Sequence, residues 1–256
     1  MGPSLDHIRI DSYGKHTMIA PSTALLSALT LILTLLGCDR PAAPPVAKEG
    51  GPQRSQVIVA AGDSLSAGFG VAEPDNYPSQ LDKRLQAAGL DYRVVNAGVS
   101  GETSSGLLSR LDWLLSLNPA IVILETGAND GLRGVDPTLT KENMRKIIRL
   151  LQERRITIIL AGMRMVYNLG PDYTEAFNRI YPELAREFDL LFIPFVLEGV
   201  AANPALNIED GIHPNRDGYR ILVDTLYPFV LQAIELRKGQ TPPAGSPPPA
   251  SPQGTP

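Results

Sequence analysis

The fold is decided by the stretch Gln56-Val57-Ile58-Val59-Ala60-Ala61-Gly62-Asp63-Ser64. Its apolar part is typical of a strand that is buried on both faces of a parallel sheet. The glycine that follows lets the backbone turn sharply and lets another group approach closely. Ser64 therefore stands where the strand ends, either as a turn or cap residue or as a nucleophile.

Strand-like and helix-like patterns alternate downstream of this stretch. Short apolar runs predict further strands at Tyr92–Val95, Ala120–Glu125, Ile156–Ala161 and Leu190–Ile193. Apolar residues at helical spacing predict helices over Pro78–Ala88, Thr103–Leu117, Thr140–Arg154, the region of Phe177–Leu184, and Asn215–Leu236. Pro182 is expected to kink or divide the fourth of these helices. Together the βα units predict an α/β domain with a five-stranded parallel sheet and helices on both faces.

The N-terminus carries the clearest processing signal. Residues 1–37 contain a short basic segment and then an apolar run, which is typical of a secretory signal peptide. The run ends in Leu35-Leu36-Gly37-Cys38, which resembles the bacterial lipobox, whose cysteine is lipidated and becomes the mature N-terminus. Cys38 is the only cysteine, so no intrachain disulfide can form. We expect an exported lipoprotein, anchored through Cys38 on the periplasmic side of the bacterial envelope; an uncleaved transmembrane anchor is the alternative.

One domain is predicted between two compositionally distinct ends. Residues 38–55 are rich in Pro, Ala and Gly and are predicted to be a linker. Residues 237–256 contain no large apolar run and are predicted to be a disordered tail. The domain is then residues 56–236, and we expect it to be a monomer. The net charge of −4, without a basic stripe, argues against nucleic acid as a partner.

Polar motifs stand where the predicted strands end. Ser64 follows the first strand, Asn96–Thr103 the second and Thr126–Asp130 the third, and Asp210–Pro214 precedes the last helix. In a sheet of this kind, ligands bind beyond the carboxyl ends of the strands, at the switch point in strand order. The four motifs are therefore predicted to meet at one edge of the sheet.

The number of histidines limits the choice of a general base. The chain has three, His7, His16 and His213, and the first two would be lost with the signal peptide. His213 is then the only imidazole available near neutral pH. Asp210 lies three residues upstream and can reach one ring nitrogen while the other faces Ser64, as in a serine triad. The alternative is a helix-entry histidine that is satisfied by local hydrogen bonds.

Four sequence blocks resemble those of the SGNH (GDSL-type) hydrolases. They are GDSL at Gly62–Leu65, the glycine within NAGVSGET at 96–103, G-x-N-D at Gly127–Asp130 and D-x-x-H at Asp210–His213. The segments GDSLSAGFG, NDGLRG, YPELA and DGIHPN look like the branch of arylesterases and of the acyl-CoA thioesterase I/lysophospholipase. The resemblance covers nearly all of residues 56–234 and implies a three-layer, flavodoxin-like fold.

The resemblance also implies roles for particular residues. Ser64 would be the nucleophile, His213 the general base and then acid, and Asp210 the residue that orients His213. The backbone N–H groups of Ser64 and Gly98 and the side-chain amide of Asn129 would hold the oxyanion. The implied activity is that of a serine esterase acting on small acyl or aryl esters or on lipids, with thioesters and lysophospholipids as further candidates.

Other functions stay open on the residues alone. The same triad would serve a deacetylase of envelope polysaccharide, and the domain could instead be a surface-attached binding module without chemistry. A metal-dependent phosphoesterase using Asp63 and Asp130 is disfavoured, because two-metal sites gather several carboxylates and histidines. We expect no metal and no cofactor, and we expect both aspartates to accept hydrogen bonds from backbone amides and so fix their loops. The loop Gly162–Tyr173 departs from the branch, so the acyl chain length is the least transferable property.

Overall fold

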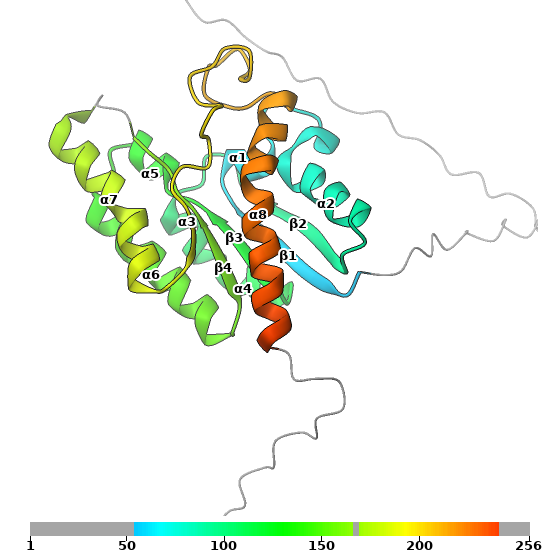
Figure 1. Ribbon diagram of the computed structural model, residues 1–256. Helices are drawn as coiled ribbons and strands as arrows, with labels where there is room; N and C mark the ends of the chain where they lie inside the picture. Colours follow the sequence, from blue (N-terminus) through cyan, green and yellow to red (C-terminus); the bar gives the residue numbers. More distant parts are fainter. Residues whose placement is uncertain (1–53, 166–168, 241–256) are drawn as a thin grey trace, which may run out of the picture. The chain divides into compact units, whose positions relative to one another are not determined.

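The computed structural model describes residues 54–165 and 169–240 (Figure 1). The predicted signal peptide, Cys38 and nearly all of the predicted linker lie outside these ranges, as does the tail from residue 241 onward. None of the helices in the described ranges combines the length and the hydropathy of a membrane-spanning segment.

The centre of the domain is a five-stranded parallel sheet with the strand order β2-β1-β3-β4-β5. Its strands are β1 (Gln56–Gly62), β2 (Tyr92–Gly98), β3 (Ile121–Glu125), β4 (Thr157–Ala161) and β5 (Leu191–Ile193). Gly62 pairs with Gly98 on one side and with Glu125 on the other, so these three strands end at the same level. The strand order reverses direction between β1 and β3, which places the switch point directly beyond Gly62.

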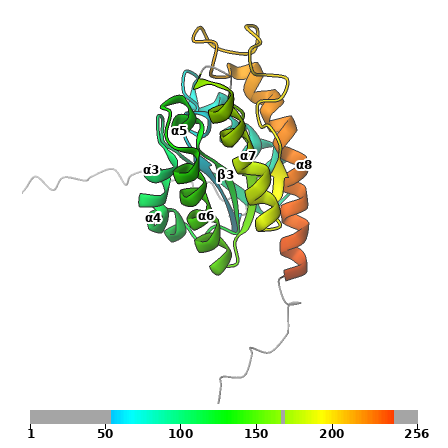
Figure 2. The same ribbon diagram turned by 90° about the vertical axis from the view of Figure 1, so that its left-hand side faces the viewer.

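Helices cover both faces of this sheet. One face carries α2 (Tyr77–Ala87) and α8 (Arg216–Gln240), which contact each other; the other carries α3 (Ser104–Ser109), α4 (Leu111–Ser116), α6 (Pro137–Glu153) and α7 (Pro171–Glu187). Figure 2 shows α8 on one side of the sheet and α4 and α6 on the other. Three short helices, α1 (Ser64–Ala67), η1 (Glu73–Asp75) and α5 (Ala128–Leu132), belong to the connections. The predicted three-layer α/β fold is confirmed.

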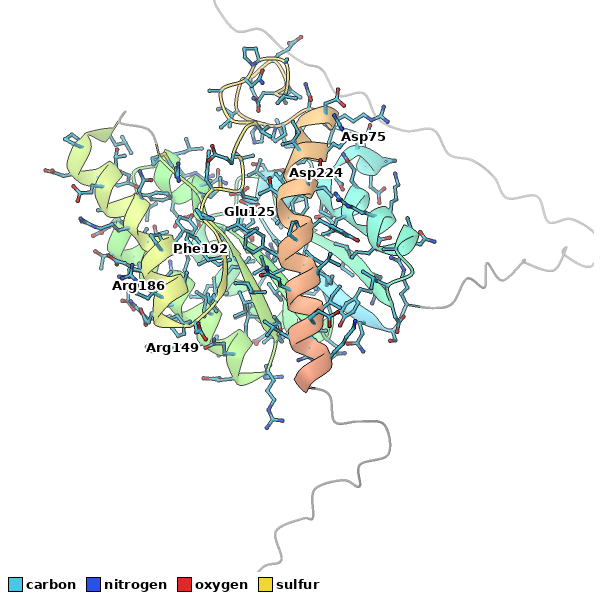
Figure 3. The ribbon with its side chains drawn as sticks, viewed as in Figure 1. Asp75, Glu125, Arg149, Arg186, Phe192 and Asp224 are labelled. Carbon is cyan, nitrogen blue, oxygen red and sulfur yellow. The ribbon has the colours of Figure 1, made fainter. Side chains whose placement is uncertain are left out.

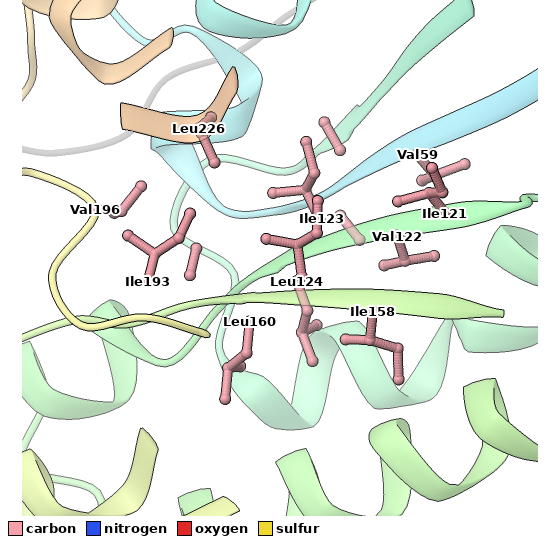
Figure 4. Close-up of a cluster of buried hydrophobic side chains, with 14 of the residues drawn as sticks. Val59, Ile121, Val122, Ile123, Leu124, Ile158, Leu160, Ile193, Val196 and Leu226 are labelled. Carbon is pink, nitrogen blue, oxygen red and sulfur yellow. The ribbon is translucent and has the colours of Figure 1, made fainter. Parts of the chain in front are cut away.

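The core lies on both faces of the sheet because the central strands are apolar along their whole length. All of β3 is buried, and so is β1 from its second residue onward. Figure 4 shows these side chains packed with those of β4, of the loop after β5 and of α8. The apolar stripe of α6 is fully buried; its members are Met144, Ile147, Ile148 and Leu151. Burial of such side chains stabilises the fold by roughly 1.5–3 kcal/mol each.

Three helices differ from their predicted form. The helix predicted over 103–117 is broken at Arg110, whose side chain turns inward to Glu102 and to the carbonyl of Ala97. Pro182 does not divide α7, because burial of the flanking apolar face outweighs the one lost backbone hydrogen bond. The last helix continues to Gln240, four residues beyond its predicted end at Leu236.

Candidate active site

Ser64 is the first residue of α1 and follows β1 after only Asp63. Asp63 caps this helix, since its Oδ1 accepts a hydrogen bond from the N–H of Leu65 at 3.1 Å. The helix ends after one turn at Gly68, which has a φ of +81°. The strand-to-helix turn therefore holds the Ser64 hydroxyl beyond the carboxyl end of the sheet.

His213 and Asp210 come from the loop between β5 and α8, which Figure 1 shows above the carboxyl ends of the strands. The Nε2 of His213 lies 2.8 Å from the Oγ of Ser64, and its Nδ1 lies 2.6 Å from Oδ2 of Asp210. The other carboxylate oxygen of Asp210 accepts from the N–H groups of Ile212 and His213 at 2.9 and 3.0 Å. The structure thus brings together three residues that the sequence motifs singled out.

The charge on Asp210 decides where the imidazole proton sits. Partial burial opposes ionisation, but hydrogen bonds from the backbone and the ring of His213 and from Ile212 N–H lower the pKa of Asp210 to about 2. The carboxylate can only accept at neutral pH, so Nδ1 of His213 must carry the proton that it donates to Oδ2. Nε2 is then left to accept from the hydroxyl of Ser64.

Asn129 reaches the same place from the end of β3. It lies in the first turn of α5, and its Nδ2 donates to Oδ2 of Asp63 at 3.2 Å. A side-chain amide has two N–H groups, so one remains for a ligand in the cavity that Asn129 and Ser64 both line.

Gly98 does not occupy the predicted position of an oxyanion donor. Its N–H donates to Oδ1 of Asn96 at 2.9 Å, and it is not among the described residues that line the cavity. A Cβ on Gly98 would lie 2.1 Å from the backbone nitrogen of Ala67, so this glycine allows β2 to pack against α1. The structure thus does not bring Gly98 to the cavity: the loop holds two glycines, and the motif does not tell which N–H turns toward the serine.

The other glycine of this loop, Gly101, does lie at the cavity, and the prediction did not name it. It lines the cavity with Ser64 and has a φ of +78°, a backbone conformation that favours glycine. Its carbonyl accepts from Arg133 at 2.7 Å, and its N–H has no hydrogen-bond partner within the described part of the chain. The signal that could have found it is a second glycine placed inside a turn rather than at the end of a strand.

The cavity beside Ser64 is small and mainly apolar. It has a volume of about 220 Å³, and its apolar lining is formed by Leu65, Phe69, Ala128, Leu132, Met163, Leu197 and Ile212. Phe69, Leu132 and Ile212 are each about half exposed and form its mouth. The Phe69 ring also lies 4.7 Å from that of His213. Met163 belongs to the loop after β4, of which residues 166–168 lie outside the described ranges.

The two remaining aspartates of the motifs hold loops, as predicted. Asp130 accepts from both the N–H and the Oγ of Ser104, at 2.7 and 2.6 Å, and from the Oγ1 of Thr140 at 3.2 Å. Its carboxylate therefore ties the start of α3 to α5 and α6. Asp63 has the corresponding role at α1.

Comparison with known proteins agrees with this geometry. Residues 60–221 match the GDSL-like Lipase/Acylhydrolase family, so the match covers more than half of the chain. The chain belongs to this family. It is an SGNH hydrolase, and the predicted family is confirmed.

Similar proteins give the type of bond that these hydrolases cleave. Esterase TesA of Pseudomonas aeruginosa is 38% identical over 175 residues, which are 68% of this chain and 87% of that protein. Thioesterase 1/protease 1/lysophospholipase L1 of Escherichia coli is 39% identical over 171 residues, 66% of this chain and 81% of that protein. A crystal structure of TesA superposes with a TM-score of 0.67 at 37% identity, covering 70% of this chain and 99% of the other. This SGNH hydrolase is therefore an enzyme acting on ester bonds, and the comparisons lend no support to the deacetylase or the binding module.

Proposed function

We propose that the protein is a serine esterase that works through an acyl-enzyme on Ser64. The observation that carries the proposal is the continuous chain from Asp210 to His213 to Ser64, with distances of 2.6 and 2.8 Å. Ser64 Oγ attacks the ester carbonyl while its proton passes to Nε2 of His213, and the imidazolium then protonates the departing alcohol. A water molecule, deprotonated by His213, releases the acid and restores Ser64.

Three N–H groups are proposed to hold the negative charge that develops on the carbonyl oxygen. They are the backbone N–H groups of Ser64 and Gly101 and the free N–H of the Asn129 amide. Support comes from their common position at one cavity and from the hydrogen bond that fixes Asn129 to Asp63. Loss of one such donor typically costs about 3–4 kcal/mol of transition-state stabilisation.

The substrate is proposed to be an ester with a small or medium-sized acyl or aryl group. Support comes from the apolar lining and the apolar mouth formed by Phe69, Leu132 and Ile212. The names of the similar proteins, esterase and thioesterase/lysophospholipase, place thioesters and lysophospholipids among the candidates. A polar polysaccharide would leave this lining without complementary contacts.

The test is a series of p-nitrophenyl esters of increasing acyl length, hydrolysed by the wild type and by Ser64→Ala. We expect Ser64→Ala to lower kcat/KM more than about a thousandfold and to abolish labelling by a fluorophosphonate probe. Ser109→Ala, an exposed serine on α3 that bonds only its own helix, is the matched control and should keep full activity. A steep preference for acetate would favour the deacetylase, and labelling of Ser64→Ala would contradict the assignment of the nucleophile.

A further inference from the structure

A buried carboxyl group lies under the turn that carries Ser64. It belongs to Glu125, the last residue of β3, which is 1% exposed and is labelled in Figure 3. Its Oε2 accepts from the N–H of Asp63 at 3.2 Å and from the Oγ of Ser66 at 3.0 Å. Ser66 Oγ in turn lies 2.8 Å from the hydroxyl of Tyr77. This one oxygen therefore connects β3 to the beginning and the middle of α1.

The glycine before Asp63 is required by the same carboxyl group. A Cβ on Gly62 would lie 2.3 Å from Oε2 of Glu125 and equally close to the Oγ of Ser66. No side chain larger than hydrogen fits between them. The first glycine of the serine motif thus leaves room for Glu125, in addition to any freedom that it gives the backbone.

The surroundings of the second Glu125 oxygen favour the protonated form of this carboxyl group. Oε1 is fully buried and receives no hydrogen bond from the described residues. An ionised oxygen without a donor would be costly there, whereas a protonated oxygen is itself a donor. Asp63 adjoins Glu125, since its backbone N–H donates to Oε2, and two neighbouring buried carboxyls do not both ionise.

The proton belongs to Glu125 rather than to Asp63. Burial raises the pKa of both groups, and the neighbouring Asp63 charge raises that of Glu125 further, to well above its ordinary range. The Asp63 carboxylate is stabilised in return by Leu65 N–H and by the Asn129 amide. Glu125 receives its hydrogen bonds on one oxygen only, which leaves the other free to hold a proton.

We propose that Glu125 is a positioning residue that stands as a neutral acid beneath the serine turn, with its Oε2 accepting from the N–H of Asp63 and the Oγ of Ser66. Asp63 is thereby held with one oxygen on the cap of α1 and the other on the amide of Asn129. The Asn129 amide can then turn its second N–H only toward the cavity. The effect on catalysis rests on the proposed esterase mechanism, whereas the protonation state of Glu125 does not.

The other titratable groups around Glu125 do not compete for this proton. Tyr77 from α2, Tyr181 from α7 and Tyr219 from α8 are buried, and burial, together with the Asp63 carboxylate, raises the pKa of each. They remain neutral hydroxyls, and Tyr181 donates to the carbonyl of Thr126 at 2.8 Å. His213 interacts electrostatically with Asp63 and favours its charged form.

The decisive experiment is an infrared difference spectrum between the wild type and Glu125→Gln at pH 7. We expect the wild type to show the carbonyl band of a protonated carboxylic acid and the variant to lack it. Glutamine keeps the shape and places an N–H donor where the acid had its proton. Absence of the band in the wild type would overturn the proposal, whatever the activity of either protein.

The positioning role is tested by steady-state kinetics on the same esters. Glu125→Gln should retain kcat within about threefold, whereas Glu125→Ala should lose up to about 100-fold in kcat with KM changed less than about threefold. Leu151→Ala, a core truncation at the opposite end of the sheet, is the control for a loss of stability alone and should keep the wild-type kcat. Equal losses in the Gln and Ala variants would contradict the neutral-acid role. If the wild type hydrolyses none of these esters, and so cannot be distinguished from Ser64→Ala, the proposed esterase function is contradicted instead.

Discussion

At the scale of single residues, the proposed catalytic chain depends on one carboxylate that is ionised at neutral pH. Asp210 receives two backbone N–H groups as well as the imidazole, which lower its pKa to about 2. Because this folded value lies below the ordinary 3.8, Asp210 adds stability above pH 3.8, and that contribution is lost as the pH falls toward 2. At higher pH, therefore, the titration of Asp210 should not contribute to the pH dependence of kcat.

Replacing Asp210 by Asn should therefore expose its electrostatic role. An asparagine cannot stabilise the imidazolium and favours the wrong tautomer of His213, so we expect kcat to fall by roughly 10³–10⁴-fold. The measurement is the pH dependence of kcat between pH 4 and 9 for both proteins. If the wild type shows an acid limb above pH 4 that disappears in Asp210→Asn, Asp210 titrates in that range and its assigned charge is wrong.

The proposal that Gly101, rather than Gly98, is an oxyanion donor can be tested by replacing two asparagines. Asn129→Ala removes a proposed oxyanion donor and should lower kcat by about 10²–10³-fold. Asn96→Ala is a matched control at the same edge of the sheet, because Asn96 only accepts from Gly98 N–H and bonds weakly to Ala67. It should stay within about threefold of wild type. A loss of similar size in Asn96→Ala would instead favour Gly98 as an oxyanion donor.

Sequence patterns could predict Ser64, Asp210 and His213, because Ser64 comes directly after a strand and the other two come directly before a helix, at places that the topology dictates. They could not separate Gly98 from Gly101, since that depends on the direction of one peptide group in a turn. The role of Glu125 could not be predicted from the sequence either. It continues an apolar strand, and only the close approach of Gly62 shows that its carboxyl group faces α1.

At the scale of elements, the strands could be predicted because apolar residues run without interruption through them. Helix ends and breaks depend on polar side chains instead. Arg110 interrupts the helix between α3 and α4, with its guanidinium on Glu102 at 2.6 Å and on the Ala97 carbonyl at 2.7 Å. No periodicity of apolar residues contains this information.

The Arg110–Glu102 pair should stabilise the loop that carries Gly101. Both side chains are mostly buried, so Arg110→Met leaves a carboxylate without its partner and should lower the free energy of unfolding by about 3 kcal/mol. The double variant Arg110→Met/Glu102→Leu should recover part of that loss. Urea denaturation of the single and double variants measures the coupling, and strictly additive effects would show that the pair contributes nothing.

The pair of carboxyls beneath α1 predicts a pH-dependent stability. The folded pKa of Glu125 is raised above its ordinary 4.5, so the folded state holds a proton that the unfolded state has lost. The free energy of unfolding should therefore fall as the pH rises above about 4.5, by at most about 1.4 kcal/mol per pH unit. Glu125→Gln should lack this slope. Parallel unfolding curves for the two proteins between pH 5 and 8 would contradict the prediction.

At the scale of the whole molecule, we propose that the enzyme is anchored to the bacterial envelope through Cys38. The support is the sequence Leu35–Cys38 at the end of an apolar leader. In cells that produce the full chain, the wild type should incorporate labelled palmitate and sediment with membranes. Cys38→Ala should do neither, with an intact esterase activity in both. Membrane association that persists in Cys38→Ala would favour an uncleaved anchor.

Both ends of the described chain leave the domain from the amino edge of the sheet. Arg54 bonds the carbonyl of Tyr92 at the start of β2, and Arg237 near the end of α8 bonds the carbonyl of Arg155 just before β4. Ser64 lies at the opposite edge. A bead, an electrode or a fusion partner attached at either end would therefore leave the mouth of the cavity open to solution, so an immobilised enzyme should turn over soluble esters as fast as the free one.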